Sequence, residues 1–556
     1  MFKGHPKGLY VLFFSNMGER FGYYTMMAIF ALFFEAKFGL HPEDVGFVWS
    51  GFLTAVYALP VLGGILADRI GYGRIVSLGI ILMFSGYFMM SVPGTTQIFI
   101  YLSLFVIALG TGFFKGNLAV ILGNLYERAE YKPLHDHAFN IYYMGINIGA
   151  FFAPYAATGI RDVLMGTDGF TYDARVPGMA HQFIKGTLET GKLAELKTIA
   201  LQQMGGSFTS VSAFCQSYLD SLSTGYNAGF AIAGASIVIS LLIFLGFRKY
   251  YKHADLLQKD RIKADPTTVQ LAPKQVRDRL VALILVFIVV IFFWMAFHQN
   301  GLTLTWFAKN YTAGSVGPFT KIFFDIWAFL AFVGIIAGII FLVGRKFAKN
   351  LKLFSIALLL ISGGVLYNRY ITFSEGPTNS ISPELFQSFN PMFVVFLTPV
   401  VVAFFAWLGK KGKEPSTPKR MAFGMLITAV GFMILVVGSF KLASPQSLLS
   451  QGGVSELLVS PYWLISTYFT LTIAELNISP MGLAFVAKVS PPQFRGMMQG
   501  GWLGATAVGN TLSGFVAIPW SNLSLVQTFG LLVATSLVAA ILMFSILRIL
   551  ERATHS

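Results

Sequence analysis

Glu19 and Arg20 stand next to each other inside the first long apolar stretch of this chain, residues 9–34. Tyr23 and Tyr24 follow within one helical turn, and their i, i+3 and i, i+4 spacing places both on the helix face that carries Arg20. Charged side chains are costly in hydrocarbon, so these must face a protein interior or a wet cavity. The stretch therefore predicts a binding surface within a membrane, with an internal salt bridge that pins helices together as the alternative.

The composition indicates a polytopic α-helical membrane protein. Of the 556 residues, 55% are hydrophobic and only 12% are charged, whereas about a quarter are charged in a typical soluble protein. Apolar segments of about 20 residues recur along the whole chain, each long enough to cross a bilayer as a helix, and they lack the alternation of β-barrel strands. The net charge of +15 fits the cytoplasmic loops of a membrane protein and requires no nucleic acid as partner. Cys215 is the only cysteine, which excludes an intramolecular disulfide and a multi-cysteine metal site.

We expect about fourteen membrane-spanning helices. They are predicted near residues 9–34, 45–67, 75–93, 97–123, 138–160, 225–247, 280–308, 320–343, 353–372, 391–408, 421–440, 461–487, 497–518 and 525–547. Lys and Arg gather in the loops of one side if the N-terminus is cytoplasmic, so both termini are expected inside. Residues 161–224 then form an extracytoplasmic loop with a helical stretch at 182–203, and residues 248–279 form a basic cytoplasmic linker.

Gly64, Asp68, Arg69, Gly71 and Arg74 lie in a loop that closes the second predicted span. Its glycines allow a tight turn, and its acid and bases are expected to lock the cytoplasmic ends of neighbouring helices. The loop resembles the signature loop between helices two and three of the major facilitator superfamily. We therefore expect these residues to be structural and not catalytic.

Seven further stretches resemble a narrower family, the proton-dependent oligopeptide transporters. They are residues 19–24, 110–117, 139–149, 387–391, 415–418, 474–480 and 494–510, in the family's order and over most of the chain. The resemblance implies two six-helix bundles around a central cavity, here residues 1–247 and 280–556, which open to the two sides of the membrane in turn. It also implies inward symport of di- and tripeptides with protons, at a site near the bilayer midplane. Many bacterial members carry an extra helix pair between the bundles, whereas here it is expected near 320–372.

A short peptide is a zwitterion, and the chain supplies groups for both of its ends. Arg20 can fork onto a carboxylate, Lys115 is a compact cation in an apolar helix, and Glu475 is an isolated acid suited to an ammonium. Asn147 and Asn390 can each donate and accept a hydrogen bond, as recognition of a peptide bond requires. By resemblance, the peptide site includes these five residues together with Tyr23, Tyr24, Tyr57, His298, Ser479, Trp502 and Thr506.

Each assignment has a structural alternative, and the sequence leaves both open. In that alternative Lys115 only neutralises Glu19 or Glu475. The two asparagines form interhelical hydrogen bonds worth under about 1–2 kcal/mol, and Trp502 and Tyr57 are plain packing residues.

Two departures from the family pattern concern groups that carry protons. A Glu usually stands three residues before the position of Glu19, where this chain has Asn16, and a Glu of the seventh span is replaced by His298. Asn16 cannot carry a proton, whereas His298 titrates near neutrality unless burial or charge moves its pKa. The expected proton-coupling groups are Glu19, Arg20, His298 and Glu475. We hypothesise that protonated His298 repels Arg20 and so opens an external gate; the alternatives are an interior histidine with satisfied hydrogen bonds, and facilitated diffusion without tight coupling.

The sequence thus predicts a monomeric, proton-coupled peptide symporter of the inner or plasma membrane. Its partners are a di- or tripeptide and the lipid bilayer, and it needs no cofactor beyond the coupling protons. Transport of another small zwitterion or organic anion, weakly coupled facilitation, and a receptor built on a transporter scaffold are the alternatives. An intramembrane enzyme is not expected, because the chain carries no His-Glu-x-x-His and no Gly-x-Ser-x-Gly motif.

Overall fold

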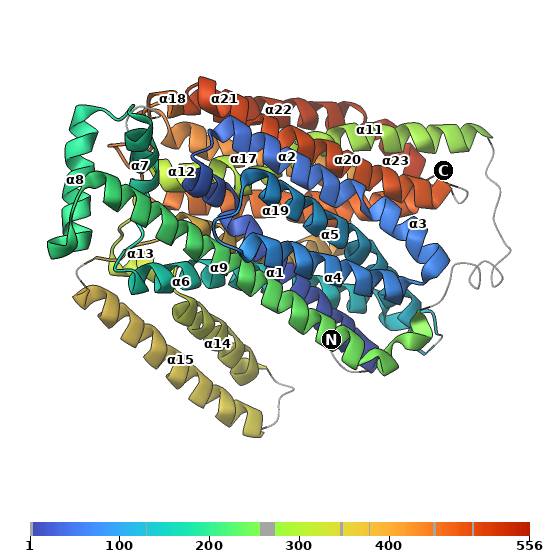
Figure 1. Cartoon of the computed structure of the whole chain (residues 1–556). Helices are drawn as coiled ribbons and strands as arrows, with labels where there is room; N and C mark the ends of the chain where they lie inside the picture. The colour runs from blue at the N-terminus through green and yellow to red at the C-terminus, as the bar shows by residue number, and fades with distance from the viewer. Residues whose placement is uncertain are drawn as a thin grey trace.

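The structure is a computed structural model (Figure 1). It describes residues 4–128, 130–255, 273–344, 349–376, 378–448, 452–491 and 494–555. Within these ranges every named element is a helix. The expected linker 248–279 falls largely on residues 256–272, which lie outside the described residues.

Eleven helical segments of the described chain are long and apolar enough to cross a membrane. They are α2 with α3 (Pro42–Ala58, Pro60–Ile70), α4 (Tyr72–Ser91), α5 (Gln97–Leu125), α9 (Val211–Gly246), α11 with α12 (Pro273–Phe297, Thr303–Tyr311), α14 (Ile326–Val343), α15 (Lys349–Glu375), α16 (Phe389–Lys410), α17 (Thr417–Gly438), α19 (Tyr462–Val489) and α22 (Leu525–Ser545). The described chain has three more long helices, α1 (Lys7–Phe38), α6 (His135–Thr167) and α20 (Arg495–Phe515). Together they match the fourteen spans expected from the sequence.

The long helices form two bundles of the major facilitator type with an additional helix pair. In the first half α1 packs on α6 and α9, and α4 packs on α5. In the second half α17 packs on α19 and α22, and α11 packs on α20. We call the end where α7 (Val176–Lys185) and α8 (Thr190–Met204) lie the cap end, and the opposite end, where α1 begins and α23 (Leu547–His555) lies, the terminal end (Figure 1).

The hydrophobic core is continuous between the halves at the cap end. One buried cluster joins side chains of α1, α2 and α9 to Trp306, Tyr311 and Trp520 of the second half. A second cluster, near the terminal end, draws its buried members from the second half among the described residues, and these include Val286, Phe485 and Met543. The halves are therefore held together by apolar packing at the cap end.

The loop between α6 and α9 is shorter than the expected 161–224, because both helices extend beyond the predicted spans. The helical stretch expected at 182–203 is two helices, α7 and α8. They are separated at Gly186, whose φ of 71° lies in the left-handed region that favours glycine. His181 of α7 packs on the end of α1, where its Nε2 lies 2.8 Å from the backbone oxygen of Ala36.

We expect the docking of α7 to weaken in acid. Burial, with smaller contributions from Lys185 and Lys309, lowers the pKa of His181 below its ordinary value of about 6.5. The undocked form therefore binds protons more readily, so docking is fully stable above that ordinary value and is lost as the pH falls from it toward the lower pKa of the docked form. The loss is at most roughly tenfold in the docking constant per pH unit for one such group.

Hydrogen exchange of the α7 amides, compared at pH 7.5 and pH 5.5 after correction for intrinsic rates, measures this effect. Replacing His181 with glutamine should abolish the difference, whereas the matched change His137→Gln at the terminal end should leave it intact. Equal protection of α7 at both pH values in the unmodified protein would contradict the expectation.

The helix pair α14 and α15 stands beside the two bundles (Figure 1). Asp325 caps α14 by accepting a hydrogen bond from the backbone N–H of Ala328 at 2.8 Å, and it pairs with Arg369 of α15 at 2.7 Å. Its carboxylate thus has a structural role that holds the hairpin together.

Candidate functional site

Glu19 and Arg20 form a two-pronged ion pair on α1. Arg20 donates from Nε to Glu19 Oε2 and from an Nη to Glu19 Oε1, both at 2.5 Å. Both side chains are buried, and the guanidinium also lies 4.6 Å from the centre of the Tyr23 ring. The ion pair joins consecutive residues of one helix, so it does not pin two helices together, and the acid offsets the arginine's charge.

Lys115 of α5 lies with its ammonium 4.2 Å from the centre of the Tyr57 ring of α2. Tyr57 in turn contacts His298, with 6.4 Å between ring centres, and Trp294 stacks on His298 at 5.4 Å. Lys115 is also within electrostatic range of His298. In the described part of the chain Lys115 pairs with neither Glu19 nor Glu475, so it does not neutralise them in this conformation.

Glu475 of α19 accepts a hydrogen bond from the amide of Asn390 at 2.9 Å, and the same amide donates to Thr472 at 3.1 Å. Gln387, three residues before Asn390, donates to the backbone oxygen of Ala28 on α1 at 3.3 Å, so the start of α16 lies beside α1. Arg20 and Lys115 lie in long helices of the first half, and Glu475 lies in a long helix of the second half.

Four other expected site residues are buried or half-buried, and two of them donate to the backbone of their own helices. Trp502 is 3% exposed and packs so closely on α19 that a Cβ on Gly482 would lie 1.9 Å from its ring. The Thr506 hydroxyl is buried and donates to the Trp502 backbone oxygen at 3.0 Å. The half-buried Asn147 donates to the backbone of its own helix at 3.1 Å. Ser479 is half-buried, one helical turn from Glu475.

Asn16, at the position where the family pattern has a Glu, has a structural role. Its side chain is buried, and its amide donates to the backbone oxygen of Tyr142 on α6 at 3.4 Å. The amide thus links α1 to α6, a contact that a carboxylate could not make by donation.

The loop between α3 and α4 turns at Gly71, whose φ is 107°, whereas Gly64 lies inside α3 with open space around it. Asp68 accepts from the Tyr72 hydroxyl at 2.5 Å, while Arg69 and Arg74 are exposed. The hydrogen bond from Tyr72 links the acid at the end of α3 to the start of α4. Asp255 also reaches the start of α4, where it accepts from the backbone N–H of Gly73 at 2.9 Å. The expected part of the two bases in locking the helix ends stays a prediction.

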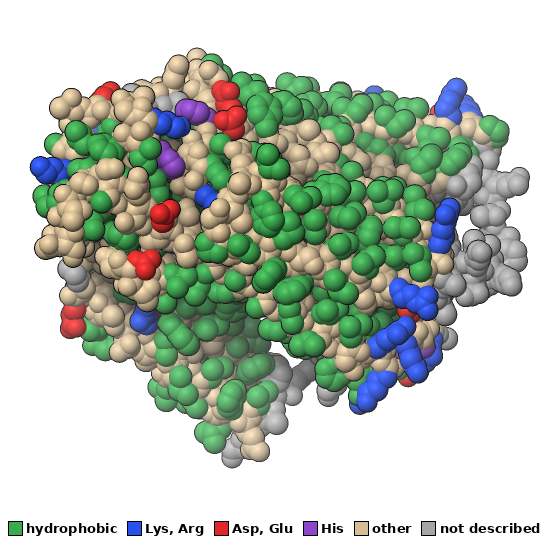
Figure 2. Space-filling model, in the orientation of Figure 1, with side chains coloured by type: hydrophobic (Ala, Val, Ile, Leu, Met, Phe, Trp, Pro, Cys, Tyr) green, Lys and Arg blue, Asp and Glu red, His purple; other side chains and the backbone are tan. Residues whose placement is uncertain are grey.

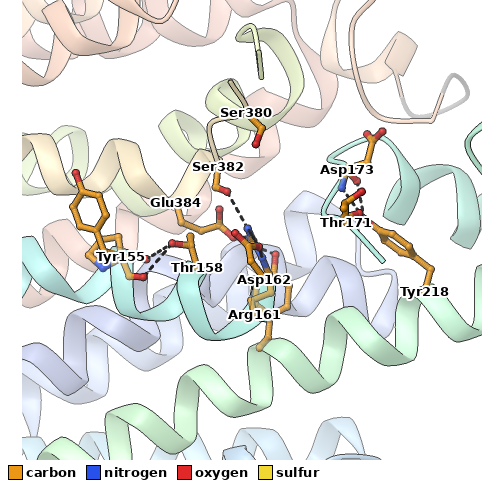
Figure 3. A network of polar contacts seen from close by, with 12 residues as sticks. Tyr155, Thr158, Arg161, Asp162, Thr171, Asp173, Tyr218, Ser380, Ser382 and Glu384 are labelled. Atoms are coloured by element: carbon orange, nitrogen blue, oxygen red, sulfur yellow. Dashed lines mark hydrogen bonds and ion pairs between the residues drawn. The ribbon is translucent and has the colours of Figure 1, made fainter. Parts of the chain in front are cut away.

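Sequence reasoning missed the buried ion pair between Arg161 of α6 and Glu384 of the short helix η6 (Pro383–Ser388). Both side chains are 0% exposed, and the pair joins the two halves at the cap end. Figure 3 shows Ser382 and Glu384 pointing toward Arg161 from their own segment. Arg161 also donates to Ser382 at 2.9 Å and to Asp162 at 2.7 Å.

Aromatic side chains seal this ion pair. The guanidinium of Arg161 lies 3.9 Å from the centre of the Tyr172 ring, and the Tyr226 hydroxyl donates to Glu384 at 3.3 Å. Burial, then the neighbouring Tyr226 and Glu384, raise the pKa of Tyr172 well above its usual value. The pair thus sits in a water-poor environment, where removal of one partner is costly.

Further contacts close the same end. Lys309 of α12 pairs with Glu35 of α1 at 2.5 Å, with both side chains largely buried. Trp49 of α2 donates to Ser513 of α20 at 3.2 Å. The two helices pack so closely that a Cβ on Gly514 would lie 2.1 Å from the α2 backbone.

The model of a family described as the POT family matches residues 73–277 and 362–529. The chain is 26% identical to an uncharacterized transporter, YclF, of Bacillus subtilis, over 99% of this chain and 96% of that protein. It is 27% identical to dipeptide and tripeptide permease B of Salmonella typhimurium, over 92% of this chain and 86% of that protein.

Solved structures share the fold. A peptide transporter POT in complex with sulfate matches with a TM-score of 0.65 and 22% identity, over 100% of this chain and 96% of that one. A POT family transporter in complex with 5-aminolevulinic acid matches with a TM-score of 0.64 and 20% identity, over 100% and 98% of the two chains.

Proposed function

This chain belongs to the POT family, and we propose that it imports di- and tripeptides together with protons by alternating access. It is a multi-pass membrane transporter and not an enzyme. Peptide transport is supported by the dipeptide and tripeptide permeases among its relatives. The expectation of a monomer stays a prediction.

The observation that carries the proposal is the placement of opposite charges on opposite halves. Arg20 and Lys115 lie on the first half, and Glu475 lies on the second. A zwitterion between them directs its carboxylate to the cations and its ammonium to Glu475. The amide nitrogen of Asn390 already donates to Glu475 at 2.9 Å and to Thr472 at 3.1 Å, so its side-chain oxygen is the group that can accept from the N–H of the substrate's peptide bond.

The charge distribution supports an orientation. Lys and Arg gather over the terminal end in Figure 2, whereas acidic and basic side chains are mixed at the cap end. Basic residues favour the cytoplasmic side, so we place both termini inside and the cap end outside. In this conformation the protein is then closed to the outside, and Arg161–Glu384 acts as an outer gate between the halves.

Uptake of labelled dialanine into proteoliposomes, with an alkaline interior, tests the proposal. We expect accumulation that collapses when a protonophore is added, and competition by tripeptides but not by single amino acids. A second candidate substrate class is suggested by the relative bound to 5-aminolevulinic acid. Uptake of that compound without uptake of dialanine would overturn the peptide proposal and favour a small zwitterion.

Replacing His298 with glutamine is expected to lower the dependence of uptake on the pH gradient roughly fivefold or more. Lys115 and His298 contact the same ring, that of Tyr57, whereas Arg20 is held by Glu19. Protonation of His298 would therefore repel Lys115; the repulsion of Arg20 expected from the sequence stays a prediction. Gradient-driven uptake and counterflow exchange are measured in parallel, and only the first should fall.

The control for this experiment is His137→Gln, an exposed histidine at the terminal end. Undiminished gradient dependence in the His298 variant would reject the coupling role. It would leave His298 as an interior residue stacked on Trp294.

A further inference from the structure

A small pocket opens between α4 and α9 at the terminal end, away from the proposed peptide site. Its volume is about 270 Å³, and two arginines, Arg74 and Arg248, lie on its wall. Ser77 and the buried Tyr251 also line it. In Figure 2, Lys and Arg side chains gather at the end of the molecule where α3, α4 and α9 meet.

The two arginines are available to a ligand. Arg74 is exposed, and the Arg248 side chain is 56% exposed. The acid near them is Asp255, 3.9 Å from Arg248. Its carboxylate is already held by the backbone N–H of Gly73 at 2.9 Å, and it lies so close that a Cβ on Gly73 would be 2.5 Å from it. The three charges leave the pocket net positive.

The rest of the wall is aliphatic and faces outward. Leu78, Ile81 and Leu245 line the same pocket and are 42%, 47% and 48% exposed. These three residues lie on α4 and α9, which cross the membrane, and they lie further into those spans than the two arginines do. Cations beside an exposed apolar wall match a phospholipid, in which an anionic phosphate is followed by an acyl chain.

We infer that this pocket binds an anionic phospholipid of the inner leaflet, with its phosphate between Arg74 and Arg248 and an acyl chain along Leu78, Ile81 and Leu245. A free phosphate would engage the arginines alone and would leave the aliphatic wall without a ligand. The lipid would join the start of α4 to the segment that follows α9, where Asp255 already makes the same connection.

Native mass spectrometry of the full chain, released from detergent with dioleoylphosphatidylglycerol or dioleoylphosphatidylcholine, tests the inference. We expect one tightly retained phosphatidylglycerol. The double variant Arg74→Gln/Arg248→Gln should weaken its retention roughly 30-fold. The charge-matched control Arg69→Gln/Lys249→Gln changes exposed residues that do not line the pocket and should retain the lipid.

Three outcomes would overturn the inference: equal weakening in the control, which indicates diffuse attraction to a basic surface; equal retention of phosphatidylcholine; or full displacement by millimolar inorganic phosphate.

Hydrogen exchange of residues 72–81 in the unmodified protein gives a measurement that does not depend on the variants folding. Protection there should rise in nanodiscs that contain phosphatidylglycerol and not in phosphatidylcholine alone, and unchanged protection would also count against the site.

Discussion

Replacing Arg161 with methionine is expected to lower peptide uptake at least roughly 100-fold while the protein still inserts and folds. The variant leaves Glu384 buried without its cation in the closed cap end. Breaking a buried pair in this way costs about 3–5 kcal/mol, and that cost falls only on the conformation in which the residues meet. The closed cap end is then depopulated and the transport cycle stalls open to the outside.

A buried reporter cysteine measures the shift directly. Cys215 is the only cysteine, so a Cys215→Ser background is free of thiols. Ser388 is 3% exposed and donates to the Phe151 backbone oxygen at 3.1 Å across the closed cap end. Ser388→Cys should react slowly with a membrane-impermeant maleimide in the parent and rapidly in the Arg161 variant.

The double variant Arg161→Met/Glu384→Leu separates a gate from a general structural role. Replacing both partners of a buried pair by apolar residues is often neutral, so slow labelling should return. The matched control is Arg175→Met, because Arg175 is 46% exposed and pairs with Asp173 and Glu195, where such a pair contributes little. Unchanged labelling and unchanged uptake in the Arg161 variant would show that this ion pair is not part of the outer gate.

The sequence predicts the membrane spans well, because apolar segments of about 20 residues rarely form anything other than a membrane-spanning helix. Sequence reasoning missed the outer ion pair for a related reason. Arg161 follows immediately on a span predicted to end at residue 160, so the sequence predicts it in the loop, whereas α6 continues to Thr167. Glu384 lies 223 residues away in a segment without apolar periodicity. Nothing local indicates that the two meet.

The central region was predicted more fully, because its residue types are rare in apolar helices. Glu475 and Asn390, expected at a peptide site, are in direct contact. The shared face of Arg20 and Tyr23 is present, with 4.6 Å between the guanidinium and the ring centre, but helix periodicity does not predict contacts that depend on packing between helices. Trp502 fills the space left by Gly482, a pairing that no helical periodicity encodes. Glu19 and Arg20 are adjacent and point in different directions on the helix, yet their long side chains meet.

Replacing Glu475 with glutamine is expected to weaken dialanine binding roughly 30-fold to several thousand-fold, the cost of removing one partner of a desolvated charge pair. Glutamine keeps the size of the side chain and an oxygen that can accept from Asn390, which donates to Glu475 at 2.9 Å. The change therefore removes charge with little disturbance to packing. Isothermal titration of dialanine and N-acetyl-dialanine against both proteins measures the effect.

N-acetyl-dialanine isolates the contribution of the substrate's ammonium, because it lacks this group and keeps the carboxylate and the peptide bond. The parent protein should bind dialanine far more tightly than its acetylated form, and the Glu475→Gln variant should bind both alike. An equal loss for both peptides would make Glu475 a structural residue. If the variant kept its preference for dialanine and lost only its response to the pH gradient, Glu475 would carry the proton, and the substrate ammonium would have to meet a different group.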